Sequence, residues 1–347
     1  MTATADQTRV GDNVPGPRRR APRLALTLLA TVALLGVAIL LSLAVGTKYV
    51  PVADVWQALT EPGTGYADTV VASRIPRTVL GVLVGASLAV AGAVMQGITR
   101  NPLADPGLFG VNAGAAAAIV TGIAFLGLGS TATSVWVALP GSLIAVVVVY
   151  LVGSGAGPST PVRLVLAGVV VSAVLAAYIQ AITLSLPDVF ASYRFWVIGS
   201  LAGRDPALIG EILPFVAAGL ALALALAASL NTLALGDDTA RALGAHVGRT
   251  RILGAVATTL LCAASTAAVG PIAFIGLAVP HIVRTVTGSD HRWLLPHCLV
   301  AGAALLLLAD VVGRVIINPA ELMVGVVTAF VGAPVLVLAV RRMKAAA

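Results

Sequence analysis

Ten apolar segments constrain this chain more than any other feature of its sequence. A helix needs about 20 predominantly apolar residues to cross the roughly 30 Å hydrocarbon core of a bilayer. Segments of that length, or nearly so, recur along all 347 residues. They are Leu24–Val45, Thr78–Gly97, Leu108–Leu126, Val135–Val152, Val162–Leu186, Leu208–Leu230, Ile252–Gly270, Ile272–Val286, Leu294–Ile316 and Leu322–Val340. The sequence therefore predicts an all-α, polytopic membrane protein with about ten transmembrane helices.

The composition agrees with this class and excludes several others. Hydrophobic residues make up 59% of the chain and charged residues only 10%, and the mean hydropathy is +1.02. Soluble domains carry about 25% charged residues, so this chain cannot cover itself with a solvated surface. A soluble enzyme, a nucleic-acid-binding domain and a disulfide-stapled secreted module are excluded.

The positive charges predict how the segments are oriented, because cytoplasmic loops accumulate Lys and Arg. With the N-terminus inside and all ten segments crossing, 15 of the 21 basic residues lie on the inner side and 6 on the outer. The eighth segment has only 15 residues and contains Pro280 near its end, where we expect Pro280-His281 to interrupt the helix. If it failed to cross, the basic residues after position 340 would lie outside. We expect ten spans in the cytoplasmic membrane, with both termini cytoplasmic.

This topology divides the chain into three parts. Residues 1–23 form a basic cytoplasmic tail, residues 24–342 the ten-helix membrane domain, and residues 343–347 a short cytoplasmic tail. The run Arg18-Arg19-Arg20 could open a secretory signal, but the apolar run that follows has 22 residues, against about 7–15 in a signal peptide. The net charge of +7 is thereby explained by topology and calls for no nucleic acid.

The sequence lacks the residue patterns that several kinds of catalysis and metal binding require. The two cysteines, Cys262 and Cys298, lie in apolar segments and form no CxxC pair, which predicts buried hydrophobic side chains. Neither Lys48 nor Lys344 stands in a P-loop, and HExxH and GxSxG motifs are absent. We therefore predict no catalytic residue, no metal site and no cofactor, and no ATP hydrolysis by this chain.

Charged residues at the predicted outer face have two interpretations each. Arg74 and Arg77 flank Pro76 just before the second segment, and they either snorkel to the interface or bind carboxylates of a partner. Asp310 lies inside the ninth segment with Arg314 one helical turn later. This spacing favours a local ion pair, but an acid in a span is also what an ion-coupled secondary transporter would use.

Two segments at the predicted inner face carry more special residues than a simple hairpin needs. The turn between the second and third spans contains Asn101-Pro102 and Asp105-Pro106, dipeptides that initiate turns. The loop Asn231–Gly244 contains Asp237 and Asp238, where a helix start favours negative charge. It predicts either a solvated connection or a short helix on the cytoplasmic face, whose apolar side chains are available to a partner: Leu235, Ala240, Leu243 and Val247.

Taken together, these segments resemble the permease subunits of type II ABC importers of the FecCD type, which carry iron–siderophores, haem and cobalamin. The resemblance covers the chain from about residue 50 to its end. It rests on six stretches in the family's order: Arg74-Ile75-Pro76-Arg77, MQGITRNPLADPGLFG (95–110), LALGDDTARALG (233–244), VGPIAFIGLAVPHIVR (269–284), LLADVVGR (307–314) and NPAELMVGVVTAFVGAPVLVLAV (318–340).

The resemblance implies a permease fold and a set of partners. Two ATPase subunits, which bind ATP and magnesium, would sit at the cytoplasmic face, a second permease subunit would complete a homo- or heterodimer, and an extracytoplasmic binding protein would deliver an iron–siderophore for translocation by alternating access. Arg74, Arg77 and Arg314 would dock that binding protein. The coupling loop 231–250 would engage the ATPase through Gly236, Asp237, Asp238, Ala240, Arg241, Leu243 and Gly244.

The resemblance also places the fifth span on the translocation path, with Tyr178, Gln180, Thr183 and Ser185 as its polar residues. The cargo stays open among siderophore, haem and cobalamin, because a path lined by small apolar residues recognises little. The rival from another class is an ion-coupled secondary transporter that uses Asp310. The two differ in whether the isolated chain accumulates solute without an ATPase.

Overall fold

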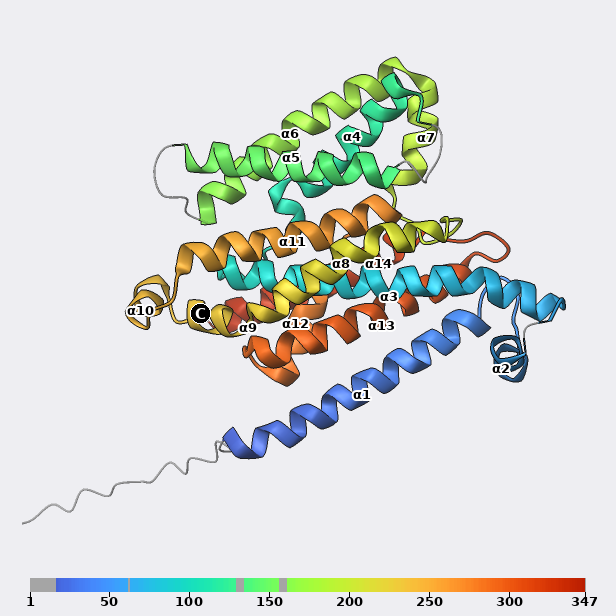
Figure 1. Ribbon diagram of the computed structural model, residues 1–347, viewed down its shortest axis with the longest axis horizontal. Coiled ribbons are helices and arrows are strands. Elements are labelled where there is room, and N and C mark those ends of the chain that lie inside the picture. Colours follow the sequence, from blue (N-terminus) through green and yellow to red (C-terminus); the bar gives the residue numbers. More distant parts are fainter. Residues whose placement is uncertain (1–16, 62, 129–133, 156–160, 347) are drawn as a thin grey trace, which may run out of the picture.

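The computed structural model describes residues 17–61, 63–128, 134–155 and 161–346, which fold into helices with no strand among them (Figure 1). Most of the predicted N-terminal tail lies outside the described residues. The elements are α1 (Pro17–Ala44), α2 (Val52–Thr60), α3 (Tyr66–Thr99), the 3-10 helix η1 (Pro106–Phe109), α4 (Val111–Leu126), α5 (Ser134–Ser154), α6 (Pro161–Ser185), α7 (Pro187–Val197), α8 (Ala207–Ala225), α9 (Ala227–Ala234), α10 (Asp237–Ala242), α11 (Val247–Val269), α12 (Ile275–Thr287), α13 (His291–Ile316) and α14 (Val324–Ala346).

Ten of these helices coincide with the ten predicted spans, which confirms the fold class. Seven are long and apolar enough to cross a membrane: α1, α3, α5, α6, α8, α11 and α13. The other three, α4, α12 and α14, are apolar but shorter.

The structure corrects several boundaries. The second span starts twelve residues before Thr78, because α3 begins at Tyr66, where the Asp68 carboxylate accepts a hydrogen bond from Gly65 N–H at 3.0 Å. Such a carboxylate satisfies one of the free N–H groups of a first turn. The predicted sixth span is divided at Leu226 into α8 and α9. The helices α2 and α7 were not predicted; α7 begins at Pro187, a residue that suits a first turn.

The prediction that Pro280 interrupts the helix was also wrong, because α12 continues through this proline to Thr287. A proline inside a helix cannot donate to the carbonyl four residues earlier, which here belongs to Gly276. That carbonyl instead accepts a hydrogen bond from Gln96 Nε2 of α3 at 3.2 Å. The neighbouring helix thus replaces the missing partner, and the short helix stays intact.

The long helix α3 forms the centre of the bundle. It packs against α8, α11, α12 and α13, while α1 lies along the outside of α13 (Figure 1). Twenty of its residues are buried, and half of these are Gly, Ala, Ser or Thr. Its close contacts use glycine on both sides: a Cβ at Gly85 would overlap the backbone of Gly302, and one at Gly92 would overlap that of Gly276. Small residues let helices approach closely in lipid, where no hydrophobic force drives them together.

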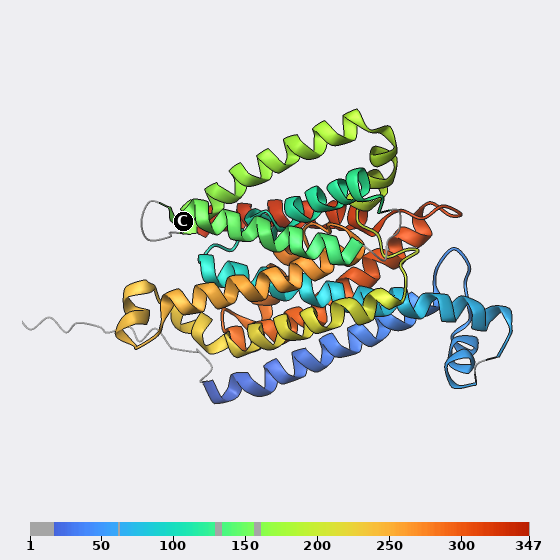
Figure 2. The same cartoon turned by 45° about the horizontal axis from the view of Figure 1, so that its top comes forward.

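The two ends of the bundle differ. The start of α1, the C-terminus and α10 lie at one end, and α2 lies at the other with the first turns of α3 (Figures 1 and 2). We call these the α10 end and the α2 end. The helices α4, α5 and α6 form a layer on one side of α11 (Figure 1).

Candidate functional sites

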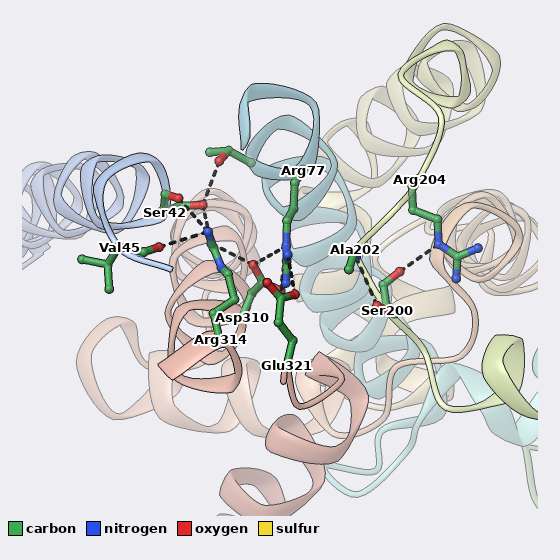
Figure 3. Close-up of polar contacts among 10 residues, drawn as sticks. Ser42, Val45, Arg77, Ser200, Ala202, Arg204, Asp310, Arg314 and Glu321 are labelled. Atoms are coloured by element: carbon green, nitrogen blue, oxygen red, sulfur yellow. Dashed lines mark hydrogen bonds and ion pairs between the residues drawn. The ribbon is translucent and has the colours of Figure 1, made fainter. Parts of the chain in front are cut away.

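The α2 end holds five charged side chains that we call the outer cluster: Arg74, Arg77, Asp310, Arg314 and Glu321. Asp310 lies between two arginines (Figure 3). Its Oδ1 accepts from Arg77 Nη2 at 2.8 Å, and its Oδ2 is 2.9 Å from Arg314 Nη2. The local Asp310–Arg314 ion pair predicted from their spacing is confirmed.

Arg314 is the most deeply placed cation of the outer cluster, with 2% of its side chain exposed. Its Nη1 donates to the carbonyl oxygens of Ser42 and Val45 at 2.8 and 3.1 Å, and its Nη2 donates to the Ser42 hydroxyl at 2.9 Å (Figure 3). All three acceptors belong to Ser42 and Val45, which lie where α1 ends. Arg314 therefore ties the end of α1 to α13.

Arg74 has a similar structural setting. It is buried, and its guanidinium donates to the carbonyl oxygens of Leu43 and Lys48 at 2.7 and 2.6 Å. Only the third arginine reaches the rim of the cluster: Arg77 is 15% exposed and contacts Glu321, which is 31% exposed, at 2.7 Å. The structure thus brings the three predicted docking arginines together, but it places two of them inside the protein.

The outer cluster carries excess positive charge. Three guanidinium groups face two carboxylates, those of Asp310 and Glu321. Sequence reasoning singled out the arginines and Asp310, but it gave Glu321 no role. At the rim Glu321 pairs with Arg77, so this carboxylate offsets the positive charge that the cluster presents to solvent.

A further arginine at this end was not predicted to have a role. Arg204 Nε donates to Ser200 O at 2.9 Å, and its Nη2 donates to Val269 O at 3.2 Å (Figure 3). Burial lowers the pKa of this guanidinium from its ordinary value. Arg204 fastens the loop between α7 and α8 to the end of α11.

At the α10 end, the predicted short helix is present as α10. It begins after Gly236, whose φ of +104° favours glycine, and Gly244 follows it at a φ of +80°. Asp237 lies among three arginines: Arg251 at 3.0 Å, Arg100 at 3.3 Å and Arg241 at 3.9 Å. Arg241 also contacts Asp238 at 3.0 Å. These pairs fix α10 to the ends of α3 and α11.

The apolar residues of this segment fall into two groups. Ala240 and Val247 are buried against Leu233, so they hold α10 in place and offer nothing to a partner, contrary to the expectation from sequence. Leu235 and Leu243 are 60% and 64% exposed. Two large apolar side chains thus project from the α10 end.

The turn before η1 owes its special residues to local hydrogen bonds. Asn101 Oδ1 accepts from Leu103 N–H at 3.0 Å, and Asp105 Oδ1 accepts from Gly107 N–H at 2.8 Å. Burial raises the pKa of Asp105, while the Gly107 hydrogen bond opposes that shift. These contacts account for the Asn-Pro and Asp-Pro dipeptides as turn chemistry.

The four polar residues predicted to line a path on α6 do not share one face. Tyr178 and Ser185 are seven residues apart, about two helical turns, so they lie on one side, and Gln180 lies nearly opposite Tyr178. Thr183 is buried and donates to Ile179 O of its own helix at 2.8 Å. Tyr178 Oη lies 2.8 Å from Thr121 Oγ1 of α4.

A bundle of ten apolar helices, with a cationic cluster at one end and a structured helical loop at the other, defines a polytopic membrane permease. The FecCD transport family model matches residues 34–342. The ferric enterobactin transport system permease protein FepD of Escherichia coli is 50% identical over 312 residues, which cover 89% of this chain and 93% of that protein. The Fe(3+)-citrate import system permease protein YfmD of Bacillus subtilis is 44% identical over 261 residues, covering 75% and 78%.

A solved structure agrees with these relatives. It shows an inward-facing conformation of a metal-chelate type ABC transporter, is 27% identical, and superposes with a TM-score of 0.80 over 92% of this chain and 99% of that one. The chain belongs to the FecCD transport family. It is the permease subunit of an ABC importer, and the ATPase is not part of it.

Proposed function

We propose that this permease carries a ferric siderophore, namely ferric enterobactin or a close analogue of it, across the cytoplasmic membrane. The observation that supports this choice of cargo is the 50% identity with a ferric enterobactin permease over nearly the whole of both chains. A second permease subunit and two ATPase subunits complete the transporter. The α10 end faces the cytoplasm, and an extracytoplasmic binding protein docks at the α2 end.

The ion pairs of Asp310 disfavour the alternative function, an ion-coupled secondary transporter that uses this residue. A proton carrier needs a carboxylate that can exchange its proton with a path, whereas both oxygens of Asp310 are held by guanidinium groups at 2.8 and 2.9 Å. Only 2% of this side chain is exposed. Asp310 stabilises the fold, and the energy for transport comes from the ATPase.

The segment Gly236–Gly244 is the surface that the ATPase engages. Its backbone is fixed by the ion pairs of Asp237, so motion of a bound ATPase is passed on to α3 and α11. The exposed side chains of Leu235 and Leu243 supply apolar contact, and Arg241 and Asp238 supply charges at the rim. An apolar centre with a polar rim is the usual anatomy of such an interface.

Reconstitution tests this proposal. Proteoliposomes that contain the chain, its second permease subunit, its ATPase and its binding protein are expected to accumulate ferric enterobactin only with ATP. Leu243→Asp should reduce ATPase co-purification and uptake by tenfold or more, because removing a central apolar contact costs about 2 kcal/mol or more. The control is Leu59→Asp in α2, an exposed leucine at the opposite end, which should retain the ATPase. Uptake by the chain without an ATPase would refute the proposal.

The outer cluster is the docking surface for the binding protein. Its three arginines and two carboxylates leave one net positive charge within the cluster, which suits an acidic side chain of a partner. Arg77 makes the direct contact. Arg74 and Arg314 act from inside, by holding the ends of α1 and α13 that frame the cluster.

Glu321→Gln is expected to tighten docking of an acidic binding protein about two- to fivefold, because an exposed charge contact contributes about 0.2–1 kcal/mol. The variant removes the negative charge that pairs with Arg77 Nη1. Asp310 still accepts a hydrogen bond from Arg77 Nη2 and so keeps the arginine side chain in place. The measurement is the dissociation constant at low and high salt, and the gain should shrink as salt rises. Glu61→Gln, an exposed carboxylate at the same end, is the matched control. Equal effects of the two variants would contradict the docking role of the cluster.

The exposed apolar face of α6 is the surface for the second permease subunit. Val162, Leu166, Val170 and Val174 are each more than half exposed. Their spacing of four residues places them along one stripe of the helix. Tyr178 and Ser185 lie further along the helix, close to the line of this stripe. They would supply polar groups to a translocation path formed between the two permease subunits.

A further inference from the structure

A groove between α5 and α11 has no role in the functions described above. It encloses about 890 Å³, within the range of about 300–1,000 Å³ that small-molecule sites occupy. The two helices run side by side (Figures 1 and 2), and the groove follows their halves nearest the α10 end. Leu164 of α6 and Phe109 of η1 also line it.

The wall of the groove is apolar. Three of its four hydroxyl groups donate to their own helices: Thr99 to Met95 O, Ser154 to Tyr150 O and Thr259 to Ala255 O, at 2.7 to 2.8 Å. The fourth belongs to Tyr150. A wall whose surface is mostly apolar, with polar groups few and mainly at one end, gives little recognition to a ferric chelate, which is rich in polar groups. It suits hydrocarbon chains.

The groove opens sideways into the space that lipid occupies. Val147 and Leu151 on α5 and Ile252 and Val256 on α11 line it, and each is at least two-fifths exposed. Both helices are long and apolar enough to cross a membrane, so side chains well inside them, such as Val147 and Val256, face its hydrocarbon region. An acyl chain can therefore enter from the bilayer itself.

The end of the groove at the membrane surface is cationic. Arg241 and Arg251 line it there, and Arg100 joins them through Asp237. These three guanidinium groups face two carboxylates, those of Asp237 and Asp238, and Arg241 is 60% exposed. Basic pockets between membrane helices at the cytoplasmic side bind anionic lipid head groups.

We propose that this groove binds one anionic phospholipid of the leaflet at the α10 end, with its acyl chains between α5 and α11 and its phosphate at Arg241 and Arg251. The apolar wall and the cationic mouth match the two parts of such a molecule. The site adjoins α10, so an occupied groove supports the segment that we assign to the ATPase. The lipid site itself rests on the groove and its charges, not on that assignment.

The test is binding of dioleoylphosphatidylglycerol to the purified full chain in detergent, followed by native mass spectrometry and by thermal unfolding. Dioleoylphosphatidylcholine and glycerol phosphate are the comparison probes. We expect one tightly retained phosphatidylglycerol that raises the melting temperature, a weaker effect of phosphatidylcholine, and none of glycerol phosphate. Equal effects of the two lipids, or an equal effect of glycerol phosphate, would overturn the proposal.

Variants separate the groove from general lipid solvation. Gly248→Phe places a ring in the groove, where a Cβ meets nothing within 4 Å, and it should weaken phosphatidylglycerol binding about tenfold or more. Gly210→Phe is the matched control, since Gly210 is an exposed glycine early in α8 with equally open space, and it should bind as the unmodified chain does.

A second variant tests the charge. The double change Arg241→Gln and Arg251→Gln should weaken phosphatidylglycerol about tenfold and leave phosphatidylcholine unchanged. If Gly248→Phe does not yield folded protein, Gly248→Leu takes its place. If either the Gly248→Phe variant or the Arg241→Gln and Arg251→Gln double variant still binds phosphatidylglycerol as the unmodified chain does, the proposal is overturned.

Discussion

Asp310→Ala is expected to destabilise the permease by about 3–5 kcal/mol, the cost of removing one partner from a buried ion pair. Asp310 is the shared carboxylate of Arg77 and Arg314. Without it, Arg314 keeps hydrogen bonds to the carbonyl oxygens of Ser42 and Val45, but its buried guanidinium loses the carboxylate with which it forms an ion pair. The repulsion between Arg77 and Arg314 is then no longer offset.

Thermal unfolding in detergent measures this loss, with Glu321→Ala as the matched control. Glu321 also pairs with Arg77, but it lies at the rim with 31% of its side chain exposed. Exposed pairs contribute about 0–1 kcal/mol, so this variant should unfold close to the unmodified chain. The double change Asp310→Leu and Arg314→Met should recover much of the lost stability, because apolar residues often replace a buried pair without cost. An Asp310→Ala variant as stable as Glu321→Ala would contradict the structural role assigned to the cluster.

The spans could be predicted from sequence because bilayer thickness fixes a length that composition reveals directly. Each of the ten apolar segments is helical, including the short eighth, now α12, although the sixth is divided between α8 and α9. The short helix at the α10 end was predictable for a local reason as well, since Asp237 and Asp238 favour a helix start and the glycines at 236 and 244 allow the backbone to turn.

The partners of the charged residues could not be predicted, because they come from distant parts of the chain. Arg77 and Asp310 are separated by 233 residues, and Arg74 is satisfied by carbonyl groups of the loop after α1. An arginine motif in sequence looks the same whether its guanidinium faces a partner or a carbonyl oxygen. The role of Pro280 was misjudged for the same reason, since the donor that replaces its N–H is Gln96 on α3.

Gly92→Leu is expected to prevent folding of the bundle. A side chain at this position would overlap the carbonyl group of Gly276 on α12. Overpacking commonly costs about 1–3 kcal/mol and occasionally more. Here the obstacle is backbone, which no change of side-chain rotamer can move, so α12 itself would have to leave α3.

That displacement would remove a second set of contacts. The Gly276 carbonyl, left free by Pro280, loses the hydrogen bond from Gln96 Nε2, and Arg284 of α12 loses its bond to Gln96 Oε1. An unpaired carbonyl is costly in the bilayer, where no water replaces the partner. Gly36→Leu is the matched control, because this exposed glycine of α1 has open space around it and should alter stability by only about 0.5 kcal/mol. The yield of monodisperse protein and its melting temperature decide the matter: if Gly92→Leu behaves as Gly36→Leu does, α3 and α12 are not packed through this contact.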